Sequence, residues 1–293
     1  MRAAPVLPTR WPTGKTLAVS VSVMLEGWTD NAAPGVGPMG NVLKPGVLDL
    51  QARSWAEYGA KEGAYRLLDV LAEAGMTAVF YVSGILAERN HALMQAITAA
   101  GHSVACHGWS QHIIPATQTI DEERADLARC IAALEASSGQ RPRGWLSPRC
   151  TPSAHTTELL AEAGMGWHCE FFDEDLPRVV QTQAGPIVGV PFTMEVNDFP
   201  HDVRYGNDPA GFAAILGDTL TGWPLVSFGR PACMDVTAHA HVYGRPYGAL
   251  AFRQALAQLK AHEAYVFQTN HDALGRIYAS ANVAFNAAPN STT

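Results

Sequence analysis

Apolar residues recur along the chain with two different spacings, one typical of β-strands and one typical of helices. The segment 16–25, TLAVSVSVML, is apolar at nearly every second position, which is typical of a β-strand. The segment 62–75, EGAYRLLDVLAEAG, instead brings Leu67, Leu68 and Leu71 onto one face of a helix. This pattern predicts a strand followed by a helix.

The alternation of strand and helix continues along the chain. In AEAGM (72–76), TAAGH (98–102) and AEAGM (161–165), a helix ends at glycine and a strand begins within a residue or two. Such short connections, with glycine as the left-handed cap, are typical of a parallel sheet. Further strands are predicted at 77–83, 166–172, 187–193, 235–242 and 264–269, and further helices at 90–101, 121–138 (with a capping box from Thr119 to Glu122), 209–221 and 247–262. We therefore predict an α/β fold: one distorted (β/α) barrel of about seven strand–helix units over about 15–280, within a single domain 1–293.

Composition and charge narrow the classes of function. The 293 residues are 47% apolar and 16% charged, and the net charge is −7 without a basic run. Nucleic acid and anionic membrane surfaces are therefore not expected as partners. We find no apolar stretch of signal-peptide length and no segment near the roughly 18 apolar residues of a membrane span. Five cysteines without a CxxC pair fit reduced thiols, so we expect a cytoplasmic location.

A long irregular segment follows the first strand. Residues 27–46 are rich in glycine and proline. A loop of this length inside a compact domain is usually functional, and closure over a barrel mouth excludes water. We expect a lid with Trp28 near its hinge; an oligomer contact or a rigid surface loop is the alternative.

Catalytic side chains of (β/α) barrels stand at the C-terminal ends of strands. This position selects Glu26, Tyr81 or Ser83, His107, Arg149 and His241. Glu26 is either a solvated acid or a general base with a raised pKa. His107 is either a buried histidine or a catalyst. Arg149 is either a surface residue or a group that neutralises a carboxylate or holds a carbonyl.

The remaining histidines form no clear metal motif. His107 and His112 lie five residues apart, whereas helical zinc motifs place two histidines four apart. At five residues apart they diverge by roughly 140° on a helix. We interpret His112 as structural. His239 and His241 share one face of a predicted strand, and we expect His239 to pack behind the site.

Aromatic and acidic residues near strand ends are further candidates. Trp28, Trp109, Trp145 and Phe172 are either pocket walls or plain core. The acidic run 173–175 is typical of a solvated loop, and one member, Asp173, is a candidate for orienting a histidine or arginine.

Several segments together resemble the polysaccharide deacetylase superfamily, whose members have a distorted (β/α) barrel. The matching segments are EYGAKEGAYRLLDVL (57–71), GHSVACHGWS (101–110), GQRPRGWLSPRCTPSAHT (139–156), WHCEFFDEDLP (167–177), PFTMEVND (191–198) and HVYGRP (241–246). Within the superfamily, the chain looks most similar to the metal-independent allantoinases and to the cyclic imide hydrolases (imidases) of pseudomonads.

Two departures from the superfamily's metal site set the expectation for cofactors. The resemblance implies two adjacent aspartates at the end of the first strand, but here that strand ends VMLEGW, with Glu26 alone. It also implies two metal-binding histidines four apart. The first matches His107, but the fourth position after it is Gln111, and His112 comes one residue late. Because catalytic zinc normally has three protein ligands, we expect no required metal, with zinc as the alternative.

The strand-end residues and the resemblance together predict a hydrolase that opens small cyclic imides to half-amides. Glu26 would act as base and proton carrier, while His107 and His241 would polarise the carbonyl or protonate nitrogen. Around the substrate we expect Arg149, Trp28, Trp109, Tyr81 and Asp173. The alternatives are an allantoinase or other cyclic-ureide hydrolase, a zinc-dependent N-acetyl polysaccharide deacetylase, and a non-catalytic saccharide-binding barrel. The resemblance also implies a homo-oligomer, a tetramer.

Overall fold

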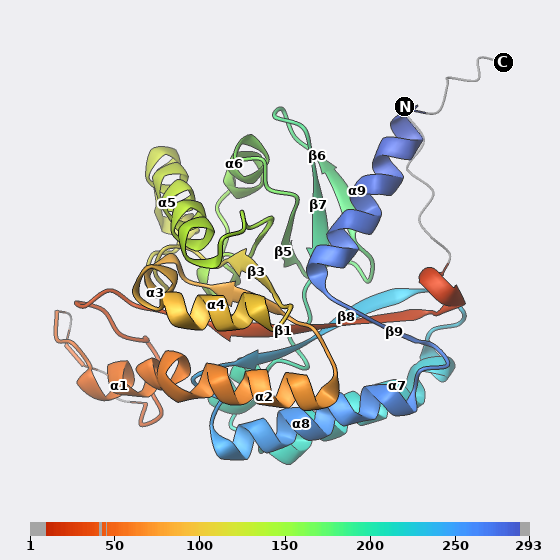
Figure 1. The fold of residues 1–293 in the computed structure, drawn as a ribbon, viewed down its shortest axis with the longest axis horizontal. Helices are drawn as coiled ribbons and strands as arrows, with labels where there is room; N and C mark the ends of the chain where they lie inside the picture. Colours follow the sequence, from red (N-terminus) through yellow and green to blue (C-terminus); the bar gives the residue numbers. More distant parts are fainter. Residues whose placement is uncertain (1–9, 41–42, 45, 288–293) are drawn as a thin grey trace.

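The fold is built on one curled sheet. The computed structural model describes residues 10–40, 43–44 and 46–287. Its nine-stranded sheet has the order β6-β7-β5-β4-β3-β2-β1-β8, and β9 also pairs with β1. Neighbouring strands run parallel except for β6 and β7. The sheet curls into a half-barrel with helices around it, which confirms the predicted α/β barrel (Figure 1).

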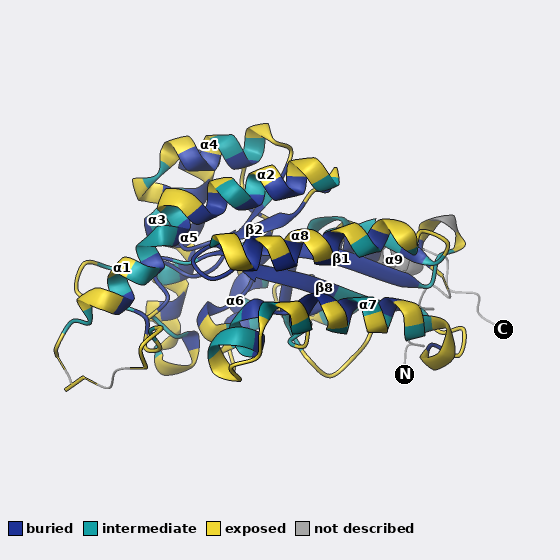
Figure 2. Ribbon diagram, turned by 90° about the horizontal axis from the view of Figure 1, so that it is seen from below, coloured by how far each residue is buried: buried dark blue, intermediate teal, exposed yellow. Residues whose placement is uncertain are grey.

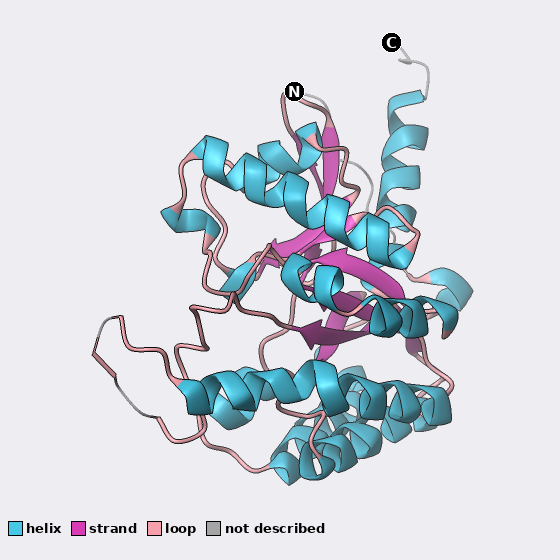
Figure 3. Ribbon diagram, turned by 60° about the vertical axis from the view of Figure 1, so that its left-hand side comes forward, coloured by secondary structure: helices cyan, strands magenta, loops and turns pink. Residues whose placement is uncertain are grey.

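The elements follow the predicted order. The strands are β1 (Leu17–Leu25), β2 (Val79–Val82), β3 (Ser103–Cys106), β4 (Gly144–Trp145), β5 (Trp167–Phe171), β6 (Arg178–Gln181), β7 (Pro186–Pro191), β8 (Ala232–His239) and β9 (Val266–Thr269). The helices are α1 (Leu50–Tyr58), α2 (Ala64–Ala74), α3 (Gly84–Arg89), α4 (His91–Ala99), α5 (Ile120–Ser138), α6 (Thr156–Glu162), α7 (Pro209–Val226), α8 (Pro246–Ala261) and α9 (His271–Ala287). Short helical turns are η1 (Pro12–Gly14), η2 (Gly59–Gly63), η3 (Pro115–Thr117), η4 (Pro148–Cys150) and η5 (Phe199–Arg204). Figure 3 shows how loops connect these helices and strands. Every helix and strand predicted by residue range exists in the structure, but β4, β6 and α3 are too short to show a period and were missed, as were α1 and α9. Of α6, only the end near Gly164 was predicted.

Strand β1 separates two apolar layers. All nine of its residues are buried. Val19, Val21 and Val23 belong to the layer between the sheet and the helices, whereas Ala18 and Met24 belong to the barrel interior. The period of two in the sequence therefore becomes two buried faces.

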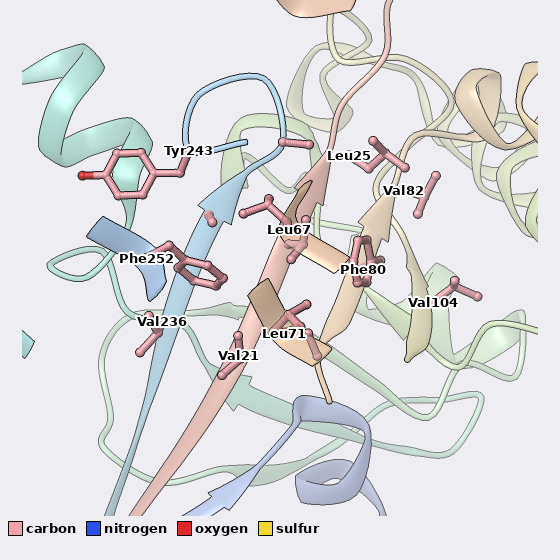
Figure 4. Packing of buried hydrophobic residues seen from close by; sticks show 14 of the residues in the cluster. Val21, Leu25, Leu67, Leu71, Phe80, Val82, Val104, Val236, Tyr243 and Phe252 are labelled. Carbon is pink, nitrogen blue, oxygen red and sulfur yellow. The ribbon is translucent and has the colours of Figure 1, made fainter. Parts of the chain in front are cut away.

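Helices α2 and α8 cover the outer layer. Leu67 and Leu71 of α2 point toward β1 and β2, and Phe252 of α8 points toward β8 (Figure 4). Burying one leucine side chain stabilises the fold by about 1.5–3 kcal/mol. The helices are buried on the face toward the sheet and exposed on the other (Figure 2). The sequence pattern of α2 is thus explained by packing.

The predicted helix ends are confirmed. Gly75, Gly101 and Gly164 have φ values of 66°, 82° and 74° and stand at or just beyond helix C-termini. At the start of α5, Thr119 Oγ1 accepts from Glu122 N, and Glu122 Oε2 accepts from Thr119 N at 2.8 Å. Local sequence signals therefore fix where these helices begin and end.

The segment after β7 lies along the free edge of β8. Thr237 N donates to Val196 O at 2.9 Å, and Asn197 forms an isolated parallel bridge with Thr237. The chain then turns through η5 at the C-terminal end of β8. This placement brings residues 192–204 beside the strand ends that carry the candidate catalytic groups.

Candidate active site

A cavity of about 430 Å³ opens at the C-terminal edge of the sheet. Among its most buried lining side chains are those of Glu26 after β1, His107 after β3 and His239 at the end of β8, with exposures of 10%, 3% and 9%. Trp28 and Phe192 are among the mainly apolar walls. Barrel enzymes carry their catalytic groups at this edge.

Glu26 lies among three imidazoles. Its Oε1 is 3.5 Å from His107 Nε2 and 3.8 Å from His239 Nε2, and its Oε2 is 3.8 Å from His241 Nε2. Burial raises the pKa of Glu26, but the hydrogen bond with His107 and the charge of His239 outweigh this effect, so the pKa falls to about 2. The expectation of a raised pKa for Glu26 is wrong, because the hydrogen bond with His107 and the other nearby imidazoles outweigh the effect of burial.

A backbone carbonyl fixes the orientation of His107. Its Nδ1 is 2.7 Å from Leu146 O, and a carbonyl only accepts, so Nδ1 carries a proton. Nε2 therefore faces Glu26. The following residue, Gly108, has φ of 67°, and a Cβ there would lie 2.5 Å from Pro148 Cγ. Glycine at this position lets the loops after β3 and β4 meet beside the cavity.

A buried carboxylate supports His239. Asp198 Oδ1 lies 2.6 Å from His239 Nδ1, and Asp198 Oδ2 accepts from His239 N at 2.7 Å and from Tyr243 N at 3.2 Å. Burial lowers the pKa of His239, but Asp198 and Glu26 raise it above its ordinary value overall. His239 is therefore the histidine of the site best able to hold a proton. The expectation that His239 packs behind the site is wrong, since it lines the cavity.

His241 lies behind Glu26. Its side chain is 1% exposed, its ring packs edge-on against Trp55 at a centroid distance of 4.6 Å, and it does not line the cavity. Burial lowers the pKa of His241 to about 4, so the imidazole is neutral near pH 7. Strand β8 ends at His239, so His241 stands in the following turn rather than on the predicted strand. The geometry gives it contact with Glu26, not with the cavity.

Two glycines allow this turn to pack on the start of α2. A Cβ on Gly63 would lie 1.8 Å from Ala240 O, and one on Gly244 would lie 2.0 Å from the same oxygen. Any larger residue would push the His239–Gly244 turn away from α2. The segments EYGAKEGAY and HVYGRP, far apart in sequence, thus pack together and place His241 behind Glu26.

Among the residues expected around the substrate, Trp28 and Arg149 line the cavity and three others do not. Tyr81 points into the barrel interior, where its hydroxyl donates to Cys169 Sγ at 3.2 Å. Trp109 is buried under the guanidinium of Arg129, 3.4 Å from the ring centroid. The placement of Tyr81 and Trp109 around the substrate is wrong, because both side chains fill the interior.

Asp173 is also absent from the cavity. Its carboxylate is exposed and pairs with Arg178 at 3.0 Å. The acid that does support the site is Glu170, whose Oε1 accepts from Ser147 N at 2.8 Å and so holds the loop that carries Arg149. Trp145 and Phe172 do not line the cavity either.

Other cavity residues were not predicted. Gln111 donates from Nε2 to His107 O at 2.9 Å, and Asn197, Phe199 and Arg204 come from the segment after β7. Asn197 lies in PFTMEVND (191–198), one of the segments that carry the family resemblance, and this segment could have pointed to it. His112, interpreted as structural, lies at the cavity with its Nδ1 2.8 Å from Ser110 Oγ.

Comparison with known proteins agrees with this fold. The Polysaccharide deacetylase family matches residues 56–167. The peptidoglycan deacetylase of Helicobacter pylori is 24% identical over 239 residues, which cover 70% of this chain and 80% of that protein. The crystal structure of a probable polysaccharide deacetylase from Pseudomonas aeruginosa PAO1 superposes with a TM-score of 0.83 at 24% identity, covering 93% of this chain and 94% of the other. The structure of PuuE allantoinase also gives 0.83, at 23% identity and 93% coverage of both chains.

Residues 56–167 therefore match this family, and the fold of the chain is that of the two solved structures. Its family-matched segment contains His107, Gln111 and Arg149, and therefore covers one side of the cavity. Glu26 and His239 lie outside this segment and are brought to the cavity by β1 and β8.

The donor set does not fit the metal that the superfamily implies. Where the resemblance implies a second metal-binding histidine, Gln111 stands with its amide nitrogen bonded to backbone. Within residues 10–40, 43–44 and 46–287, no group of three His, Cys, Asp or Glu side chains is arranged to hold a metal ion. A catalytic zinc normally needs three protein ligands.

The described part of the 27–46 segment has no helix or strand, and Ala33 to Val36 line the cavity. Residues 41, 42 and 45 lie outside the described residues, and the lid stays a prediction. The tetramer and the cytoplasmic location also stay predictions. Among the described helices, none has both the length and the apolar character needed to cross a membrane.

Proposed function

We propose that the protein hydrolyses a C–N bond of a small cyclic imide without a metal ion and opens the ring to a half-amide. The observation that carries this proposal is the position of Glu26, ionised and held between His107 and His239 at the cavity. A base and a proton donor on either side of one small cavity are the groups that amide hydrolysis requires.

The proposed reaction uses these groups in sequence. Water attacks one ring carbonyl carbon and gives a proton to Glu26, while His239 Nε2 donates a hydrogen bond to the developing oxyanion. Because the pKa of Glu26 is low, the proton does not remain there; it passes, directly or through His107, to the ring nitrogen. The C–N bond then breaks to give a carboxylic acid and a primary amide, and the acid releases its proton to solvent and becomes a carboxylate.

The reactivity of an imide fits a site without a Lewis acid. The imide nitrogen shares its lone pair between two carbonyls, so each carbonyl is more electrophilic and the nitrogen leaves more readily than in a simple amide. A cavity of about 430 Å³ with apolar walls suits a small flat ring better than a polysaccharide chain. His241, neutral against Glu26, supports the carboxylate in place rather than the substrate.

A substrate panel tests the proposal. Purified protein should be assayed with succinimide, maleimide, hydantoin, dihydrouracil, allantoin and N-acetylglucosamine oligomers. We expect the imides to be opened fastest, with the half-amide identified by mass spectrometry. Release of acetate from the oligomers without ring opening would contradict the proposal, and preference for allantoin would move the substrate to the ureides.

A further inference from the structure

The charges around the cavity are unevenly distributed. Glu26 is the only carboxylate that lines it among the described residues, and it is 10% exposed. Arg149 and Arg204 also line the cavity, and both are exposed. The charged groups at the accessible part of the lining are therefore positive, while the single negative group lies deep.

The local fold holds Arg149 at the cavity. It lies in η4, directly after β4, with φ of 57°, and the next residue, Cys150, has φ of 51°. Two consecutive non-glycine residues in this region are strained, and such strain persists only where the surroundings impose it. Here the Glu170 carboxylate accepts a hydrogen bond from Ser147 N and so fixes the loop that carries Arg149.

Arg204 lines the same cavity but comes from a different part of the chain, the segment after β7. Arg204 is the last residue of η5. Asp198, just before η5, accepts a hydrogen bond from His239 N and so holds η5 against the end of β8. Burial, Glu170 and Glu26 raise the pKa of the Cys150 thiol to about 12, while Arg204 acts in the other direction. Arg204 is therefore within electrostatic reach of Cys150, the neighbour of Arg149.

Neither guanidinium has an anionic partner in the part of the chain that the structure describes. Across the described residues, the side chains of Arg149 and Arg204 form no hydrogen bond and no ion pair. Arg178, by contrast, lies 3.0 Å from Asp173 and 2.7 Å from Glu174. Two free guanidinium groups beside an apolar cavity are suited to a carboxylate, which each can bind through two parallel hydrogen bonds.

We propose that the substrate ring carries a carboxylate, which Arg149 and Arg204 bind while the scissile C–N bond lies against Glu26. This inference rests on the proposed function and narrows it to anionic cyclic imides or amides. The carboxylate that hydrolysis creates forms beside Glu26, deep in the cavity, so the two arginines are left for a group already present on the substrate. Such remote binding orients the ring for attack.

Matched pairs of rings test this inference. The pairs are succinimide against carboxymethylsuccinimide, hydantoin against hydantoin-5-acetate, and dihydrouracil against dihydroorotate. For at least one pair we expect kcat/KM to be at least ~10-fold higher for the carboxylated ring, with the difference shrinking at high salt. Equal rates within every pair, or faster opening of the uncharged rings, would overturn the inference.

Two variants and a control locate the effect. Arg204→Gln and Arg149→Gln should each reduce the ratio of charged to uncharged kcat/KM by ~10-fold or more, whereas Arg230→Gln should leave it unchanged. Arg230 is a suitable control because it is also exposed and without a side-chain partner among the described residues, but lies outside the cavity. A ratio that survives both variants would overturn the inference. If a variant does not fold, the ring pairs and the salt dependence of the unaltered protein decide.

Failure of the proposed function has a different signature. If no ring is opened at all, the proposed function fails, and calorimetric titration with each pair then decides the inference. Tighter binding of the carboxylated ring supports it, and equal binding overturns it.

Discussion

Two clusters of carboxylate and histidine in the barrel, one in the interior and one at the cavity, differ in how completely their polar atoms are paired. In the interior, Ser20 Oγ donates to Asp235 Oδ1 at 2.6 Å and contacts His271 Nε2 at 2.8 Å, while Tyr81 OH lies 2.6 Å from His271 Nδ1. All four side chains are fully buried, and none lines the cavity. At the cavity, the nitrogens around Glu26 stand at 3.5–3.8 Å.

This difference separates a structural cluster from a reactive one. Buried polar groups with short, complete hydrogen bonds stabilise a fold, because leaving any of them unpaired costs about 1–3 kcal/mol. The looser groups at Glu26 keep bonding capacity for a substrate. A carboxylate next to a histidine is therefore a catalytic candidate only where a cavity and free atoms accompany it.

The largest expected effect is on catalysis by Glu26→Gln. The variant should keep its fold and melting temperature near that of the unaltered protein, while kcat falls by a factor on the order of 10²–10⁴, the usual contribution of a general base. Steady-state kinetics and circular dichroism measure the two quantities. The control is Asp173→Asn, an exposed acid outside the cavity, which should retain full activity. More than about a third of normal turnover in Glu26→Gln would remove Glu26 from the reaction.

The interior cluster should respond in the opposite way. Asp235→Ala leaves the hydroxyls of Ser20, Ser22 and Thr237 without their acceptor, so we expect the free energy of unfolding to fall by about 2–4 kcal/mol. The activity of the molecules that remain folded should change little. Urea denaturation followed by kinetics at low temperature checks both statements. A stable Asp235→Ala protein without activity would place the interior cluster in the mechanism.

A smaller effect concerns the pH profile. Burial lowers the pKa of His239, but Asp198 and Glu26 raise it above its ordinary value overall, so its proton is held to a higher pH than in a free imidazole and is lost as the pH rises through this raised value. We expect kcat/KM to fall on the alkaline side, while Glu26, with a pKa of about 2, stays ionised across the range from pH 5 to 8. In Asp198→Asn the alkaline fall should begin at lower pH, because the carboxylate that raises the pKa of His239 is gone. An unchanged profile in a folded Asp198→Asn protein would mean that another group, or the substrate itself, titrates there.

Local signals in the sequence predicted most of the fold. The alternation in β1, the glycines after α2, α4 and α6 and the capping box of α5 depend only on neighbouring residues, and the structure confirms them. Glu26, His107 and Arg149 were selected because they follow predicted strands, and this position also depends only on neighbouring residues. Short elements such as β4 gave no period to recognise.

The errors arose where position depends on distant parts of the chain. Tyr81 lies within a strand rather than beyond its end, so it points into the barrel. His239 lines the cavity and His241 lies behind Glu26, the reverse of the expectation. The reason is that β8 ends at His239 and the next turn packs against Gly63. Arg204 belongs to an irregular segment whose path is set by contacts with β8, which no local pattern reveals.

The most direct test is the hydrolysis of succinimide and the carboxylated rings by protein freed of metal. Metal content should be measured by mass spectrometry before and after exhaustive chelation, and ring opening followed in the same samples. We expect the rate to remain unchanged when less than about a tenth of the chains hold a metal, because Glu26, His107 and His239 supply the base and the proton donors. Stoichiometric zinc whose removal abolishes ring opening, and whose return restores it, would contradict the account.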